Sequence, residues 1–218
     1  RGPIADVLAL AGDAISAALG AAATPRGEPL RSDHAFRRVL TELARPLDLP
    51  EHELFGAPPG TLEVEPGPLY AVRVGSDLAR RTTAREQRFL LGRVAARLRS
   101  RSCLAELLPP SALGTWALAA ARAALSGTGD DELSRRVAKG LGRRARKALE
   151  PSARALLAAQ TPPDLEGYRA AAARTADRLG LVLCGDVPTA IELLLRDGGS
   201  RPPVVHADAP AAAASRPD

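Results

Sequence analysis

Apolar residues recur every three or four positions through most of the chain after Thr82, and this periodicity restricts the fold to a mainly α-helical one. Short breaks rich in Pro, Gly and Asp divide the pattern into helical segments, which span residues 82–102, 111–126, 130–150, 151–160, 163–186 and 187–196. The first segment starts with a threonine cap and has the widest apolar face, so we expect it to be the central helix. Because only 3% of the residues are aromatic, the core must be built mainly from Leu, Val and Ala.

Residues 61–75 follow a different period and predict a β-hairpin. Apolar and charged residues alternate on either side of a Pro-Gly-Pro turn, and the apolar set is Leu62, Val64, Tyr70, Val72 and Val74. The preceding residues 47–60 are rich in turn formers and predict irregular structure. A helix capped by Ser32 or Asp33 and ending near Pro46 is expected before them. The fold class is therefore mostly α with a small β-hairpin (α+β).

The N-terminal residues 4–21 predict an amphipathic helix with a thin apolar stripe that includes Leu8, Ile15 and Leu19. Its two aspartates argue against a membrane span, and no targeting segment is recognised, so a cytoplasmic protein is expected. The stripe needs a cover, either from the rest of the chain or from an upstream helical array. We therefore predict three parts. They are an N-terminal helix in residues 1–25, a mainly helical domain in residues 26–199 and a disordered, Pro/Ala-rich tail in residues 200–218.

The net charge of +5 is carried almost entirely by arginine. Heavy use of Arg, Ala, Gly and Pro is typical of GC-rich bacterial genomes, which weakens the charge as a sign of a nucleic-acid partner. The strongest electrostatic feature is the basic run 135–147, in which helical spacing places Arg136, Lys139, Arg143 and Arg146 near one face. This run has no interleaved aromatic residues, so a protein-facing or solvated helix is favoured over a nucleic-acid-binding one.

The residue types that carry common catalytic and metal chemistry are sparse and scattered. None of the three histidines, His34, His52 and His206, has a partner at metal-ligand spacing. Cys103 and Cys184 lie in apolar surroundings with no histidine nearby, which favours buried free thiols over a disulfide or a nucleophile. No catalytic residue, cofactor or metal ligand is predicted from these patterns.

Two segments together resemble a known family. Residues 69–102 (LYAVRVGSDLARRTTAREQRFLLGRVAARLRSRS) and residues 168–196 (YRAAAARTADRLGLVLCGDVPTAIELLLR) look like the HtpX-type zinc metallopeptidases, which are gluzincins. In that family a strand pair leads into a His-Glu-x-x-His helix, and a second helix carries a glutamate ligand followed by an aspartate. The run 176–181, Ala-Asp-Arg-Leu-Gly-Leu, matches the end of that second helix, and the resemblance covers roughly residues 40–196.

The resemblance implies a degenerate domain, because the family's functional positions carry no metal ligands here. Gly92, Arg93 and Ala96 fall at the His, Glu and His positions, and Ala173 falls at the glutamate ligand. Zinc needs three protein donors, which Gly and Ala lack, and an arginine repels a dication. Degenerate domains of this kind occur beside tetratricopeptide-type repeats in large bacterial proteins. Asp177 matches a supporting aspartate of the family. It is expected either to pair with an arginine such as Arg93 or to lie exposed in an i,i+4 contact.

These observations favour a non-catalytic protein-interaction or scaffolding domain of a larger bacterial protein, a pseudo-peptidase. Leu90, Leu91 and Val94 should be buried between the hairpin and the helix 173–181. The small residues Gly92 and Ala173 should let the two helices approach closely, which leaves no ligand site at the vacated centre. An unidentified protein partner would then bind an outer surface, for which the candidates are Leu8, Ile15, Leu19, Arg136, Lys139, Arg143 and Arg146. A nucleic-acid-binding protein and an enzyme of unrecognised type remain the alternatives.

Overall fold

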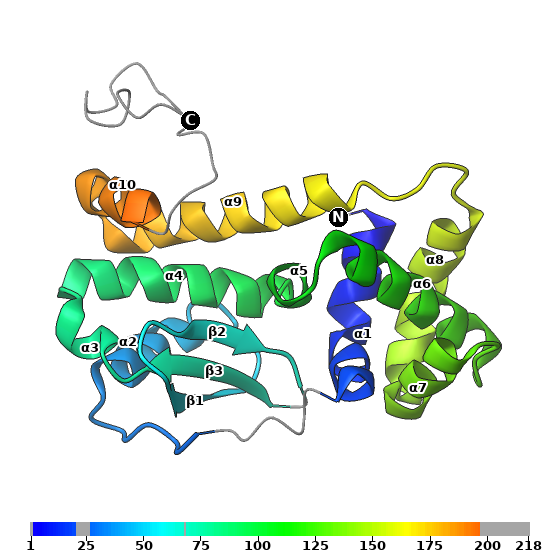
Figure 1. Cartoon of the computed structure of the whole chain (residues 1–218), viewed down its shortest axis with the longest axis horizontal. Helices are drawn as coiled ribbons and strands as arrows, with labels where there is room; N and C mark the ends of the chain where they lie inside the picture. Colours follow the sequence, from blue (N-terminus) through cyan, green and yellow to red (C-terminus); the bar gives the residue numbers. More distant parts are fainter. Residues whose placement is uncertain (1, 21–26, 68, 197–218) are drawn as a thin grey trace.

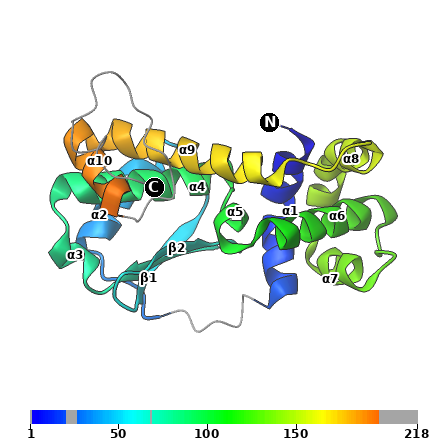
Figure 2. The same cartoon turned by 45° about the horizontal axis from the view of Figure 1, so that its top comes forward.

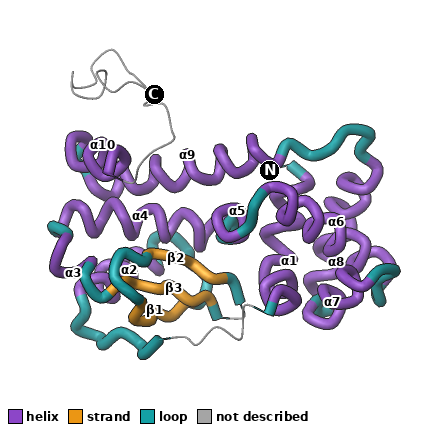
Figure 3. The backbone as a smooth tube through the Cα atoms, viewed as in Figure 1, coloured by secondary structure: helices purple, strands orange, loops and turns teal. Residues whose placement is uncertain are grey.

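The computed structural model describes residues 2–20, 27–67 and 69–196 (Figures 1 and 3). The predicted disordered tail in residues 200–218, with His206, lies outside the described residues. The helices are α1 Pro3–Leu19, α2 Ala35–Ala44, α3 Leu78–Arg81, α4 Ala84–Ser100, α5 Leu104–Leu107, α6 Pro110–Ser126, α7 Glu132–Gly140, α8 Arg143–Ala158, α9 Leu165–Cys184 and α10 Val187–Arg196. With the small sheet described next, they confirm the predicted class, mostly α with a small β component.

The sheet has three strands in the order β1-β3-β2, and it contains the predicted hairpin. The strands are β1 His52–Ala57, β2 Leu62–Glu65 and β3 Tyr70–Gly75. β2 and β3 pair antiparallel, whereas β1 pairs with β3 in parallel. The prediction of irregular structure over residues 47–60 was therefore wrong for β1. β1 is held by hydrogen bonds to β3, which comes later in the chain. The composition of residues 47–60 alone does not indicate that pairing.

Among the described residues, buried side chains form two hydrophobic clusters, and each includes residues from several separate stretches of the chain. The first, which we call the helical core, lies among α1, α6, α7 and α8. The second, the sheet core, lies between the sheet, α2, α4 and the C-terminal part of the chain in α9 and α10. The long helix α9 reaches from one to the other (Figure 2). Leu165 near its start packs against the helical core, and Cys184 at its end is buried in the sheet core.

Helix α1 is an integral part of the helical core. Leu8 and Ile15 are 1% and 0% exposed, and Leu19 packs at the edge of the same cluster. The apolar stripe is thus covered by the rest of the chain, because α6, α7 and α8 all contact α1. The prediction that this stripe forms a partner-binding surface was wrong for Leu8 and Ile15, since a buried side chain has no free surface to offer. Residues 1–25 were predicted as a separate part of the chain, but α1 shares one hydrophobic core with α6, α7 and α8.

The prediction of one continuous helix through the basic run 135–147 was wrong, because the run is divided between α7 and α8. α7 ends at Gly140 and α8 begins at Arg143, with Gly142 as its extended N-cap. A Cβ atom on Gly140 would lie only 3.1 Å from the Cα atom of Ala14, so this end of α7 packs directly on the backbone of α1. Pro151 was expected to start a new helix, but it lies inside α8. The predicted side-chain cap of α2 is also absent, since its N-cap is His34.

Candidate functional site

Helices α4 and α9 pack side by side in opposite directions, and they carry every position that the family resemblance singles out (Figures 1 and 2). α4 starts with a capping box in which the Thr83 hydroxyl accepts from the Glu86 backbone N–H at 3.3 Å and the Glu86 carboxylate accepts from the Thr83 N–H at 2.7 Å. α9 has Asp164 as its N-cap, whose carboxylate accepts from the Gly167 N–H, and Gly185 as its C-cap, with a left-handed φ of 65°.

The two helices approach most closely at a pair of glycines. A Cβ atom placed on Gly92 would lie 2.7 Å from the Cα atom of Gly180, and one placed on Gly180 would lie 2.8 Å from the carbonyl oxygen of Phe89. The close approach expected at Gly92 is therefore present. The predicted partner residue was wrong, because Gly180 rather than Ala173 faces Gly92. Ala173 lies seven residues away on α9, about 10 Å along the axis, and is half-buried.

Arg93 and Asp177 form an ion pair between the two helices. The Arg93 Nε atom lies 3.1 Å from the Asp177 Oδ1 atom, and each side chain is 16% exposed. The Arg93 guanidinium also lies over the Phe89 ring, 5.9 Å from its centroid. Of the two alternatives for Asp177, pairing with Arg93 is the one that the structure contains. A cation therefore occupies the position that the resemblance assigns to the general base.

The inner face of α4 is buried against the sheet core, as predicted. Leu90, Leu91 and Val94 are 8%, 0% and 0% exposed. Beside Leu90, a cavity of about 220 Å³ lies between β2, α3 and α4, and it is lined by Gly60, Leu62, Leu78, Leu90, Arg93 and Arg97. Burial lowers the pKa of Arg97, and the Glu106 carboxylate 2.9 Å away opposes this shift. Both arginines of this cavity thus already have carboxylate partners.

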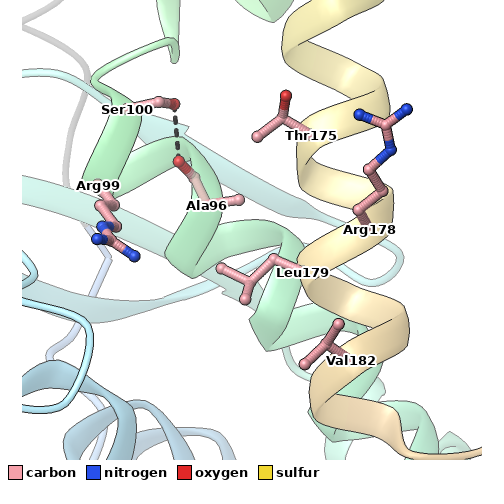
Figure 4. Close-up of a pocket in the computed structure, with 7 residues that line it drawn as sticks. All are labelled: Ala96, Arg99, Ser100, Thr175, Arg178, Leu179 and Val182. Carbon is pink, nitrogen blue, oxygen red and sulfur yellow. Dashed lines mark hydrogen bonds between the residues drawn. The ribbon is translucent and has the colours of Figure 1, made fainter.

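A larger hollow lies between α4 and α9 (Figure 4). It has a volume of about 430 Å³ and is lined by Ala96, Arg99, Ser100, Thr175, Arg178, Leu179 and Val182. We call it the α4–α9 groove. It includes Ala96, one of the positions that the resemblance assigns to a zinc ligand. Ala96 is 5% exposed and forms part of its floor. Sequence reasoning did not identify this groove, because its walls come from helices that are far apart in the chain.

The predicted basic surface is only partly available for binding. Lys139 and Arg143 are exposed near the junction of α7 and α8. Arg136 donates a hydrogen bond to the Ala18 carbonyl oxygen and lies 5.6 Å from the centroid of the Trp116 ring. Arg146 is half-buried beside Gly127. Within the described residues, the four cations of this predicted face thus differ: Lys139 and Arg143 are exposed, Arg136 is exposed but bonded to α1, and Arg146 is half-buried.

The remaining chemistry-bearing residues do not converge on one site. Cys103 and Cys184 are free and buried, as predicted, and burial raises the pKa of the Cys103 thiol to about 12. Burial also lowers the pKa of His34. Within residues 2–20, 27–67 and 69–196, no three His, Cys, Asp or Glu side chains are grouped so that they could hold a metal ion. In the same ranges, no helix combines the length and the apolar character needed to cross a bilayer.

Comparison of the chain with models of known protein families, with curated proteins and with solved structures found no match. The functional conclusion therefore rests on the residues and their geometry.

Proposed function

We propose that this chain is a non-catalytic protein-interaction or scaffolding domain of a larger bacterial protein, built on a metallopeptidase-like helix pair that has lost its catalytic residues. The ion pair between Arg93 and Asp177 is the observation that carries the proposal. In an active member of the resembled family, the position of Arg93 would hold a general base. Here it holds a guanidinium that is committed to a carboxylate on the opposite helix.

The chemistry of this pair does not suit the hydrolysis that the resembled family performs. A guanidinium stays protonated at any physiological pH, so it cannot accept a proton from an attacking water. Gly92 and Ala96 have no donor atom for a metal ion, and the contact between Gly92 and Gly180 closes the space between the helices. We therefore expect the purified chain to retain no stoichiometric zinc after dialysis, as measured by elemental analysis. One zinc per chain would contradict the degenerate-peptidase interpretation.

The exposed part of the basic surface offers a direct test of a role in protein interaction. Lys139 and Arg143 can be reversed in charge together, because both are exposed and neither belongs to a hydrophobic core. Arg38 on α2 is an exposed arginine of the other half of the molecule and serves as the control. The experiment is crosslinking of the tagged chain in cells, identification of the captured protein, and titration of that purified protein with the chain by calorimetry.

We expect the unchanged chain and Arg38→Glu to bind the identified protein with a defined stoichiometry. Lys139→Glu/Arg143→Glu should bind it less tightly if that partner uses the basic surface. A chain that binds no protein in this titration, or that turns over a peptide substrate, would contradict the proposal. A parallel titration with labelled duplex DNA and single-stranded RNA tests the alternative. Tight binding with a steep dependence on salt would favour a nucleic-acid-binding protein.

A further inference from the structure

The α4–α9 groove has an apolar floor between two cationic walls (Figure 4). Ala96, Leu179 and Val182 form the floor, and the Val182 side chain is 72% exposed. Arg99 on α4 and Arg178 on α9 stand at the outer edges of the two walls, and their guanidinium groups point away from each other (Figure 4). Among the described residues that line the groove, none carries a carboxylate. An occupant that buries Val182 therefore also meets positive charge on both flanks.

The carboxylates of the neighbouring helices do not neutralise these two arginines. In the part of the chain that the structure describes, Arg99 and Arg178 are exposed and neither lies within 4.0 Å of a carboxylate oxygen. Four carboxylates on or beside the helix pair are used by other arginines, in the pairs Arg85 with Asp186, Arg93 with Asp177, Arg97 with Glu106 and Arg196 with Glu86. The groove thus keeps an uncompensated positive charge that an acidic partner would complement.

The walls of the groove favour a helix as its occupant. Every wall residue lies on α4 or α9, whose backbone groups are used within the helices, so there is no open strand edge that an extended peptide could pair with. The hydroxyls of Ser100 and Thr175 donate to their own helices, to the Ala96 and Ala171 carbonyl oxygens. Along α9 the groove runs from Thr175 to Val182, about 10 Å or two helical turns.

We propose that the α4–α9 groove binds an amphipathic helix of a partner protein, whose apolar stripe is flanked on both sides by aspartate or glutamate. The proposal rests on the proposed function, because it assigns the surface and the chemistry of the partner to an interaction domain. The apolar stripe packs on Ala96, Leu179 and Val182, in the manner of a third helix laid into the furrow between two others. Its acidic flanks pair with Arg99 and Arg178.

The test uses the full chain and a synthetic helical peptide, labelled with a fluorophore, that has leucines at every third and fourth position and glutamates on both flanks. Binding is measured by fluorescence anisotropy. We expect saturable binding that weakens with salt, and a loss of affinity of about tenfold or more in Arg99→Glu/Arg178→Glu. Val182→Glu should have a similar effect, because it places a carboxylate in the apolar floor. The control variants Arg38→Glu and Val187→Glu are exposed residues outside the groove and should bind like the unchanged chain.

A matched peptide with lysines in place of the glutamates should not bind. The proposal is overturned if the acidic peptide does not bind, if it binds the groove variants and the controls equally, or if the lysine peptide binds as well. It is also overturned if sedimentation shows that the chain dimerises through Val182, since the occupant would then be a second copy. If the partner captured in cells still binds Arg99→Glu/Arg178→Glu unchanged, the groove assignment fails while the interaction function stands.

Discussion

The ion pair between Arg93 and Asp177 is largely buried. Removing one partner should therefore lower the free energy of unfolding more than removing both. Each side chain is only 16% exposed, so Asp177→Asn leaves a poorly solvated guanidinium without its counter-charge. We expect Asp177→Asn to lower the free energy of unfolding by about 2 kcal/mol, and Arg93→Met/Asp177→Leu to recover part of that loss. Urea unfolding of Arg93→Met, Asp177→Leu and the double variant gives the coupling energy of the pair. Additive effects would mean that the pair contributes nothing as a pair.

Glu86 should make the stability of the chain depend on pH. The backbone N–H of Thr83 and the guanidinium of Arg196 both donate to its buried carboxylate and hold its pKa below the ordinary value. Because the folded-state pKa is lowered, the stabilisation is present above the unfolded pKa of about 4.3 and is lost as the pH falls through the folded-state value. Glu86→Gln keeps an oxygen that can accept the Thr83 hydrogen bond but loses the charge. It should cost about 1 kcal/mol at pH 7 and nothing at low pH.

Glu192 provides the matched control for this pH experiment. Its side chain is 67% exposed and lies 3.5 Å from the same Arg196, so Glu192→Gln should leave the unfolding free energy nearly unchanged at either pH. The measurement is urea unfolding at pH 7 and at low pH. A Glu86→Gln variant whose loss of stability does not change with pH would contradict the assignment.

At the level of elements, the contact between α4 and α9 depends on the absence of two side chains. In a free helix, Gly→Ala gains up to about 1 kcal/mol. At Gly180 the added Cβ atom would lie 2.8 Å from the Phe89 carbonyl oxygen, so we expect Gly180→Ala to lower the free energy of unfolding by about 2 kcal/mol instead. Gly12→Ala is the control, because in α1 the nearest atom outside the helix, Leu104 Cδ1, is 4.0 Å away. Equal effects at both glycines, measured by thermal unfolding, would mean that the crossing is not tight.

What the sequence could predict follows from how local each signal is. The helices and the hairpin have their period and caps within one segment, so their existence is predictable; the cap of α7, for example, is the adjacent Asp131. The strand β1 and the packing of the end of α7 at Gly140 depend on other segments of the chain, which supply the hydrogen bonds of β3 and the close contact with Ala14. The pairing of Arg93 with Asp177 is equally non-local, and it could be proposed only because the family resemblance assigns both residues to one site. The α4–α9 groove is formed by side chains of the same two distant helices, and no sequence pattern indicated it.

At the level of the whole molecule, the two cores are interleaved along the chain. α1 contributes to the helical core, α2 to α4 contribute to the sheet core, α6 to α8 return to the helical core, and α10 completes the sheet core. α9 bridges them, and Arg169 near its start donates to the Ala105 carbonyl oxygen on α5 at 2.7 Å. Because no single cut in the chain separates the cores, we expect them to unfold in one cooperative transition.

The single tryptophan makes this cooperativity measurable. Trp116 lies in the helical core, whereas Leu91 is fully buried in the sheet core. Leu91→Ala should remove about 2 to 5 kcal/mol of stability by leaving a cavity. If the cores unfold together, the transition reported by Trp116 fluorescence shifts by the same amount as the transition followed by circular dichroism. Leu149→Ala in the helical core, the reciprocal variant, should shift both probes equally as well. If the midpoint of the Trp116 transition is unchanged in Leu91→Ala, the helical core folds as an independent unit. The contacts of α9 would then couple the stabilities of the two cores only weakly.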